Sequence, residues 1–432
     1  MTILGIAEAT VASLVRAVTD PAHDRDAVAE RFARATWTGI AEPGDRLAGL
    51  VVGAVGAEQA LAALIADREG GALSQLVSAC DGGLAGLGID ERDLDDAVAR
   101  WAPRISQADA LRALRQAARF AVQLVVPGDP DWPAPLGDLA EHAPIALWLR
   151  GRRDALADLD RGVAIVGARA ATGYGEHVTI ELAAGLVDRG YAIVSGAAYG
   201  VDGAAHRAAL ASRGTTVAFL AGGLDRFYPS GNEALITRVT DRGAAISEVP
   251  CGVAPTKWRF LQRNRLIAAA SIATVVVEAG ARSGSLNTAG HAAALGRPLG
   301  AVPGPITSSA SAGCHRLLRE YDAVCVTTAD EIAELAPLPE PLGSIADETD
   351  ADAVHADPPT VEEAEARGRR PAADPTGTRI RLLDALSARS PRSVEKVAAL
   401  SGLAADRVRA ELGLLSLDGA VRERAGGWVR AS

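Results

Sequence analysis

The 432-residue sequence has few aromatic residues, few cysteines and no long apolar run. Aromatic residues make up 4% of the chain and hydrophobic residues 48%, so Ala, Val and Leu must form most of the core. The four cysteines are scattered without a C-x-x-C pair, which argues against a cysteine zinc site and structural disulfides. Because no apolar run approaches membrane-spanning length and no signal peptide pattern is found, we expect a cytoplasmic protein without a membrane partner.

The sequence also lacks the motifs on which common hydrolases and ATPases depend. It contains no G-x-x-x-x-G-K-[ST], no H-E-x-x-H, no G-x-S-x-G and no carboxylate cluster suited to a metal. We therefore expect a protein that is not an enzyme and that needs no metal or cofactor.

The negative charge is concentrated in one segment. The net charge is −10, and the stretch from Pro337 to Ala366 holds nine acidic residues and no Lys or Arg. Removing these nine charges from −10 leaves −1 for the rest of the chain, so a basic surface there is not excluded. Since residues 337–375 are also rich in proline and poor in large apolar residues, they are predicted to form a disordered linker.

The remaining patterns predict three folded parts, as the length suggests. Residues 1–120 are Ala-rich and helical in pattern, typical of an accessory domain. Residues 121–336 alternate strands and helices, which predicts an α/β fold with an extended Rossmann-like parallel sheet. Its main strand candidates are short apolar runs: Val163–Gly167, Tyr191–Ser195, Thr215–Ala221, Ala244–Val249, Thr274–Glu278, Leu299–Val302 and Ala323–Thr327, flanked by Val122–Val126 and Ile145–Leu149.

The C-terminal residues 379–432 have the pattern of a winged helix, with three helices followed by a hairpin. Arg407 and Arg409 lie on the third helix, where a DNA-recognition helix would carry them. Asp406 and Glu411 lie on the same helix and weaken a DNA-binding interpretation. Binding of DNA and docking of a protein both remain open for this module.

The stretch from Val163 to Gly175 predicts a strand, a glycine-rich turn with Gly167, Arg169 and Gly173, and a helical pattern from Glu176. A helix start offers free backbone N–H groups to an anion, and arginine adds a forked positive charge. The turn fits a phosphate cradle and equally fits a βα turn whose glycines serve packing alone, because it is not the G-x-G-x-x-G fingerprint.

Two further strand ends carry small polar residues. Ser195 and Gly196 follow one strand, and Ser283, Gly284 and Ser285 follow another, with Thr288 beyond them. In open parallel sheets, ligands bind beyond the carboxyl ends of the strands, so these turns are predicted to share one site.

The segment from Lys257 to Arg265, KWRFLQRNR, packs four cations (Lys257, Arg259, Arg263 and Arg265) and two aromatics into nine residues. Cations can follow the phosphates of a single strand, while rings such as Phe260 stack on its bases. The alternative is a helix start whose arginines pair with acidic residues, and we favour the nucleic-acid interpretation.

Taken together, VGARAATGYG, SGAAYGVDGAAH, GGLDRFYP, SEVP, KWRFLQRNRLIA, VVEAGARSGSLNTA and AVPG resemble the DNA-processing protein A family (DprA, also called Smf). The resemblance runs from about Pro127 to Glu334 and keeps the family order. It implies a Rossmann-like domain that binds single-stranded DNA without hydrolysing it. It also implies a homodimer that loads a RecA-type recombinase onto incoming DNA in natural transformation.

The resemblance also assigns roles to residues that match the family's motifs. Arg169 matches a phosphate contact, Lys257 and Phe260 match the residues that hold the strand and face a base, and Arg263 and Asn264 complete that motif. Ser283, Gly284, Ser285 and Thr288 match a second pocket loop. Two alternatives come from other classes: a nucleotide phosphoribohydrolase of the lysine-decarboxylase-like superfamily, and a regulator built on the winged helix. The first is weakened because the turn after Glu278 lacks the catalytic Glu of that superfamily.

Overall fold

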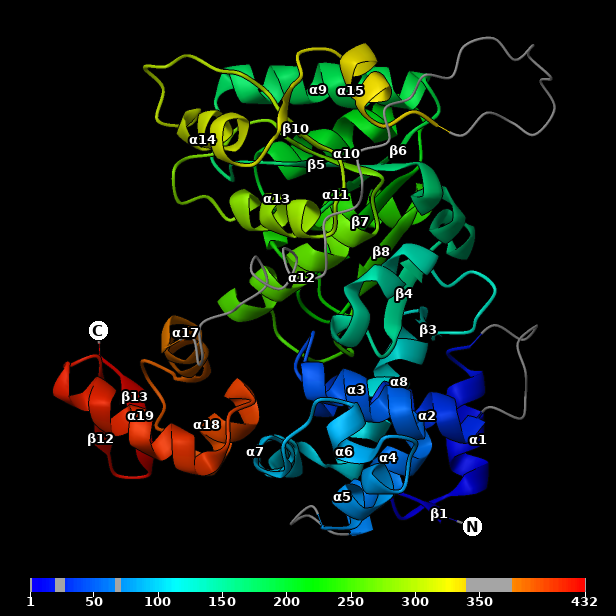
Figure 1. Ribbon diagram of the computed structural model, residues 1–432, viewed down its shortest axis with the longest axis vertical. Coiled ribbons are helices and arrows are strands. Elements are labelled where there is room, and N and C mark those ends of the chain that lie inside the picture. The colour runs from blue at the N-terminus through cyan, green and yellow to red at the C-terminus, as the bar shows by residue number, and fades with distance from the viewer. Residues whose placement is uncertain (1, 20–27, 67–70, 339–374, 432) are drawn as a thin grey trace.

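The computed structural model describes residues 2–19, 28–66, 71–338 and 375–431. It shows a helical N-terminal region, a central α/β region and a C-terminal winged helix (Figure 1), which confirms the predicted fold class. The predicted acidic linker, residues 337–375, lies outside the described residues except at its two ends.

The N-terminal region packs short helices around a pair of tryptophans. Its elements are β1 Thr2–Ile3, β2 Ile6–Ala7, α1 Glu8–Arg16, α2 Val28–Ile40, α3 Arg46–Val55, α4 Ala57–Ala66, α5 Gly71–Ser78, α6 Gly83–Gly86, α7 Glu91–Trp101, η2 Ala102–Arg104 and α8 Gln107–Arg119. The rings of Trp37 and Trp101 meet edge to face at 5.2 Å, and each indole N–H is satisfied, by Ala57 O and by Asp45 respectively. Among the described residues, no single helix is long and apolar enough to cross a membrane; α3 and α4 meet that test only as a pair bent by 108°.

The central region is built on a nine-stranded sheet in the order β11-β10-β9-β5-β6-β7-β8-β4-β3. The strands are β3 Val122–Val125, β4 Leu147–Gly151, β5 Gly162–Val166, β6 Ala192–Ser195, β7 Thr216–Leu220, β8 Ala244–Ser247, β9 Ala273–Val276, β10 Leu299–Ala301 and β11 Val324–Cys325. The seven strands from β11 to β8 pair in parallel, and β4 and β3 continue the sheet antiparallel at one edge.

Helices cover both faces of the sheet, as buried parallel strands require. The helical elements are η3 Ala134–His142, η4 Arg153–Arg161, α9 Gly173–Asp188, α10 Val201–Ala211, η5 Ser230–Asn232, α11 Glu233–Arg242, α12 Lys257–Ala269, α13 Ser285–Ala294, α14 Ala312–Glu320 and α15 Ala329–Leu335. Side chains of β5 alternate between the two layers: Val163 and Ile165 pack with α9, α10 and α15, while Ala164 and Val166 pack with α12 and α13. The N-terminal helices pack against the edge of the sheet formed by β3 and β4. There the indole N–H of Trp148 on β4 donates to the hydroxyl of Thr38.

The strand order reverses at β5, which creates a crevice at the carboxyl ends of β5 and β9. From β5 the chain builds β6, β7 and β8 to one side, and then crosses back through α12 to add β9, β10 and β11 on the other. The turns after β5 and β9 therefore diverge to opposite sides of the sheet. Such a switch point is where open α/β sheets bind their ligands.

The C-terminal module has the expected winged-helix elements, α17 Pro375–Ala385, α18 Val394–Ser401, α19 Ala405–Leu417, β12 Val421–Arg424 and β13 Gly427–Arg430. Ser393 caps α18 by accepting from the N–H of Lys396. On α19, the exposed side chains include Leu414 and Leu417, and Arg409 pairs with Asp406. In Figure 1 the module lies beside the start of α12, with α17 nearest to that helix.

A buried histidine lies between α10 and the start of β7. His206 on α10 is fully buried, and its Nδ1 lies 2.7 Å from the hydroxyl of Thr216, which itself donates to Ile193 O. His206 Nδ1 must therefore carry the proton, and Nε2 has no partner among the described residues. Burial, together with the charges of Arg263 and Arg207, lowers the pKa of His206 to about 3.

Because the pKa of His206 is lowered in the folded protein, we expect the protein to lose stability in mild acid. The unfolded chain binds a proton at His206 near pH 6.5 and the folded protein only near its depressed pKa of about 3, so stability is complete above pH 6.5 and falls between these values. Replacing His206 with Asn should reduce the stability lost between pH 7 and pH 5 by about 2 kcal/mol. Urea titrations at both pH values measure this. His177→Asn, at an exposed position on α9, is the matched control, and equal losses in wild type and His206→Asn would contradict the prediction.

Candidate functional site

A pocket of about 690 Å³ opens at the switch point between the turns after β5 and β9. The start of α12 forms its third wall. Ten of the predicted site residues line it: Gly167, Arg169, Lys257, Phe260, Arg263, Asn264, Ser283, Gly284, Ser285 and Thr288. Segments about 90 residues apart in sequence thus meet at one site, as the parallel sheet predicted.

Helix α12 presents two different faces to its surroundings. Thr256 caps it by accepting from the N–H of Arg259, and its second half is buried in the core. The pocket face follows helical spacing: Lys257, Phe260, Leu261, Asn264 and Ile267 all line the cavity. The opposite face turns toward the N-terminal region, where Arg259 donates to Glu42. Arg265, further along the helix, lies 2.6 Å from a carboxylate oxygen of Glu248, directly after β8.

Arg263 anchors this helix to the sheet instead of reaching into solvent. Its side chain is buried and donates to the carbonyls of Gly196, after β6, and Phe219, on β7. A Cβ at Gly196 would lie 2.5 Å from the guanidinium, so glycine is what lets the two chains approach. Burial lowers the pKa of Arg263 to about 10, and Asp202 opposes this effect while Arg169 adds to it.

Asn264 joins α12 to the turn after β9. Its side-chain amide donates to Gly284 O at 3.3 Å and to the side-chain oxygen of Asn287 at 3.2 Å. Within the same turn, the hydroxyls of Ser283 and Ser285 lie 2.7 Å apart. The hydrogen bonds of Arg263 and Asn264 therefore shape the pocket from within, which their sequence positions alone did not indicate.

The start of α9 is not an open phosphate cradle. The helix begins at Gly173, three residues before the predicted start, with Thr172 as its cap. The carboxylate of Glu278, buried two residues after β9, accepts from both the N–H and the hydroxyl of Thr172, at 2.9 and 2.6 Å. An anion of the chain itself already occupies this helix start, so the exposed side chain of Arg169, not the backbone, is what the first turn offers to a ligand.

Phe260 lies at the centre of a small stack in the pocket. The guanidinium carbons of Arg169 and Arg263 lie 5.0 and 5.8 Å from the centre of its ring. The ring of Tyr228 lies 5.6 Å away, tilted by 53°. Arg169, from the turn after β5, and Phe260, from α12, therefore form one contact surface.

Three pocket cations remain available to an anion. Arg169, Lys257 and Arg282 are exposed, and none of them forms an ion pair within the part of the chain that the structure describes. Arg282, in the turn after β9, was not predicted as a site residue, although its place beside Ser283 could have suggested it. The buried carboxylate of Asp202 lies opposite, and burial raises its pKa against the lowering effect of Arg263.

Three of the predicted site residues do not line the pocket. Gly173 lies in the first turn of α9, where an added Cβ would meet no atom within 4 Å. The hydroxyl of Ser195 is buried and donates to Ile165 O. The carbonyl of Gly196 accepts from the buried guanidinium of Arg263. Ser195 and Gly196 thus support neighbouring elements, and none of the three positions gives support for a direct contact with a ligand.

Comparisons with known proteins agree on one family. The family model of DNA recombination-mediator protein A matches residues 123–337, and that of the DprA winged helix domain matches residues 365–427. A DNA processing protein DprA of Mycobacterium tuberculosis is 44% identical over 322 residues, 71% of this chain and 76% of that protein. Protein Smf of Escherichia coli is 35% identical over 261 residues, 55% of this chain and 69% of its own length. The X-ray structure of DNA processing protein A from Streptococcus pneumoniae matches with a TM-score of 0.51 and 30% identity, covering 64% of this chain and 92% of that one.

The Glu278 contact predicts opposite effects for two neighbouring glycines. A Cβ at Gly175 would lie 2.1 Å from a Glu278 oxygen, whereas Gly173, in the same helical turn, has open space. Gly175→Ala should therefore destabilise the protein by about 2–3 kcal/mol, because overpacking displaces Glu278 from Thr172. Gly173→Ala should be neutral or stabilising by up to about 1 kcal/mol. Denaturant unfolding of both variants measures this, and equal stabilities would contradict the Glu278 contact.

Proposed function

The chain belongs to the DNA recombination-mediator protein A family, and on this premise we propose that it binds single-stranded DNA in the pocket at the switch point. The observation that carries the proposal is the pocket face of α12, where Phe260 lies between exposed cations at the end of a parallel sheet. A single strand has a charged backbone, which the unpaired cations can contact, and unstacked bases, on which the ring can stack.

Each part of the pocket has a distinct role in this proposal. Arg169, Lys257 and Arg282 contact phosphates from three sides, and Phe260 stacks on a base. The hydroxyl of Ser283, in a half-buried turn, contacts the strand at the pocket edge. Arg263 and Asn264 position these groups, because Nη1 of Arg263 donates to Gly196 O and the side-chain amide of Asn264 donates to Gly284 O.

A duplex suits this pocket poorly. The bases of a duplex are stacked on each other and cannot present a face to a ring unless the helix opens. The cations of the pocket surround a cavity and do not form the long flat stripe that would follow a duplex backbone.

We extend the proposal to the wider role that the family resemblance implies. The protein acts by binding alone, as a homodimer that protects incoming single-stranded DNA and loads a RecA-type recombinase onto it in natural transformation. The absence of hydrolase and ATPase motifs in the sequence supports action without turnover. Exposed apolar side chains, Ile306 after β10 and Val324 on the edge strand β11, provide surface for a partner protein.

Salt titrations of oligo(dT) binding test the DNA site. Arg169→Ala and Lys257→Ala should each weaken binding to any single strand and lower the salt slope by about 0.7, because each removes one phosphate contact. Phe260→Ala should cost about 1–3 kcal/mol through lost stacking, with little change in slope. Because the guanidinium of Arg169 lies over the ring of Phe260, the double variant should lose less than the sum of the single losses.

The matched control is Arg238→Ala, which removes an exposed arginine of α11 outside the pocket lining. It should leave both affinity and slope close to wild type. If Arg169→Ala and Lys257→Ala bind like wild type at every salt concentration while the control does the same, the pocket is not the DNA site.

A further inference from the structure

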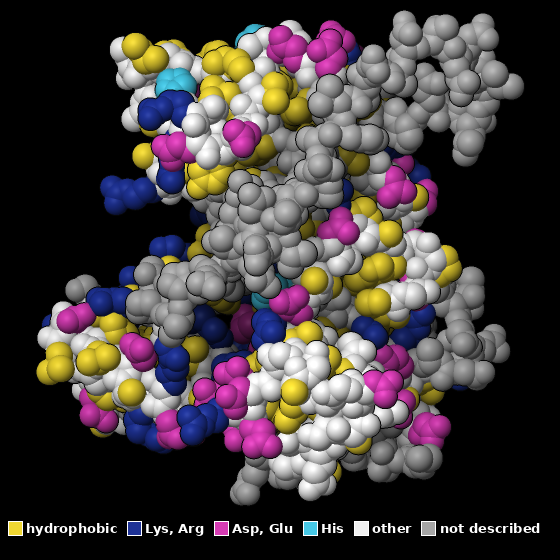
Figure 2. Space-filling model, viewed as in Figure 1, with side chains coloured by type: hydrophobic (Ala, Val, Ile, Leu, Met, Phe, Trp, Pro, Cys, Tyr) yellow, Lys and Arg dark blue, Asp and Glu magenta, His cyan; other side chains and the backbone are white. Residues whose placement is uncertain are grey.

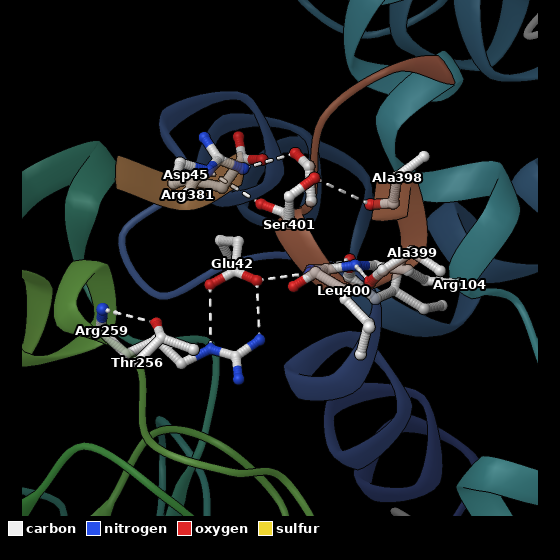
Figure 3. A network of polar contacts seen from close by, with 12 residues as sticks. Glu42, Asp45, Arg104, Thr256, Arg259, Arg381, Ala398, Ala399, Leu400 and Ser401 are labelled. Carbon is white, nitrogen blue, oxygen red and sulfur yellow. Dashed lines mark hydrogen bonds and ion pairs between the residues drawn. The ribbon is translucent and has the colours of Figure 1, made fainter. Parts of the chain in front are cut away.

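The winged helix is docked on the other two regions around one buried carboxylate, that of Glu42. Glu42, after α2, accepts from Arg259 of α12 at 2.8 and 3.1 Å and from Arg104 of η2 (Figure 3). Arg381 of α17 lies close enough that its charge lowers the pKa of Glu42, as do Arg259 and Arg104, against the opposing effect of burial. Cations from all three folded regions thus lie around one negative charge.

The end of α18 is shaped to fit this cluster. Arg104 donates to the carbonyls of Ala399 and Leu400, in the last turn of that helix, where a cation is favoured. Gly402 follows with a φ of +66°, and a Cβ there would lie 2.8–2.9 Å from Glu42, Arg104 and Arg381. Because no larger side chain would fit at Gly402, the winged helix and the N-terminal region form a closely packed and specific interface.

The same docking brings a carboxylate to the edge of the DNA pocket. Asp384 of α17 accepts from the backbone N–H of Lys257, the first residue of α12, at 2.7 Å. Arg381, one turn earlier, lies 5.4 Å from the ring centre of Trp258. Lys257 is therefore shared: its side chain lines the DNA pocket, and its backbone is held by the winged helix.

We propose that the docked winged helix restrains binding of single-stranded DNA, and that the two compete at the start of α12. Asp384 places a negative charge at the positive end of this helix, beside the cation that would meet a phosphate. An incoming phosphate is repelled by this charge, and release of the winged helix removes it. The inference rests on the proposed function, because it needs the pocket to bind DNA.

The docking contacts are of a kind that can be released. Unlike Glu278, which is buried within the central region, Asp384 is only half-buried and belongs to a separate module. The cluster is mainly ionic, and burial lowers the pKa of Arg381 to about 10, which Glu42 opposes. In Figure 2, Lys and Arg side chains gather in the recess between the winged helix, at lower left, and the rest of the molecule. Arg104, Arg259, Arg392 and Lys396 line this cleft of about 540 Å³, so undocking would expose further positive charge.

Variants of the full chain test the proposal without touching the pocket lining. Arg104→Ala removes the contacts to α18 and should release the module, which should tighten oligo(dT) binding about tenfold. Asp384→Asn keeps an oxygen for the Lys257 N–H but removes the charge, and should tighten binding about threefold. The matched control, Asp406→Ala, removes an exposed carboxylate of the same module that does not contact α12, and should bind like wild type.

Hydrogen exchange provides the second readout. In wild type, saturating oligo(dT) should speed exchange of the amides at 399–402 and at the other docking contacts of the winged helix, because competition is reciprocal. If wild type binds DNA but both variants bind no tighter and 399–402 stay protected, the restraint is disproved while the DNA site stands. If neither wild type nor variants bind single strands, the proposed function itself fails.

Discussion

The buried guanidinium of Arg263 is the contact on which the pocket depends. It ties α12 to the ends of β6 and β7, and so places Phe260 and Lys257 over the crevice where the strand order reverses. An arginine at this depth is costly unless its donors are satisfied, and the carbonyls of Gly196 and Phe219 together with the charge of Asp202 offset that cost. Without this anchor, the cations and the ring would have no common geometry.

Two helix starts near the pocket carry carboxylates of the chain itself, with different consequences. Glu278 is an internal part of the central region and fixes the first turn against the turn after β9. Asp384 comes from the winged helix and holds α12 only while that module is docked. The Glu278 contact gives the pocket a constant shape. The Asp384 contact makes the charge at the pocket edge depend on whether the winged helix is docked. Helix α12 lines the pocket with Phe260 and meets the docked winged helix with Trp258, because these side chains lie on different faces of the helix.

Much of this architecture could be predicted from the sequence. The apolar runs located each predicted strand of the sheet to within two residues, and the turn residues located the strand ends where the pocket lies. Roles that depend on distant partners could not be predicted: Arg263 and Arg169 look alike in sequence, yet one is buried and the other exposed. Glu278 binds the start of α9 through Thr172, which is 106 residues away in sequence. Asp384 binds the start of α12 through Lys257, which is 127 residues away. Local patterns carry no information on such contacts.

The central claim is that single-stranded DNA lies in the pocket walled by α12 and the turns after β5 and β9. Photocrosslinking tests this most directly, with an oligonucleotide that carries 5-iodouracil and with mass spectrometry to locate the attached peptides. We predict crosslinks to Phe260 and to the segments 257–264 and 280–288 that line the pocket with it. Crosslinks confined to the winged helix, residues 379–430, or to the N-terminal helices would contradict the account.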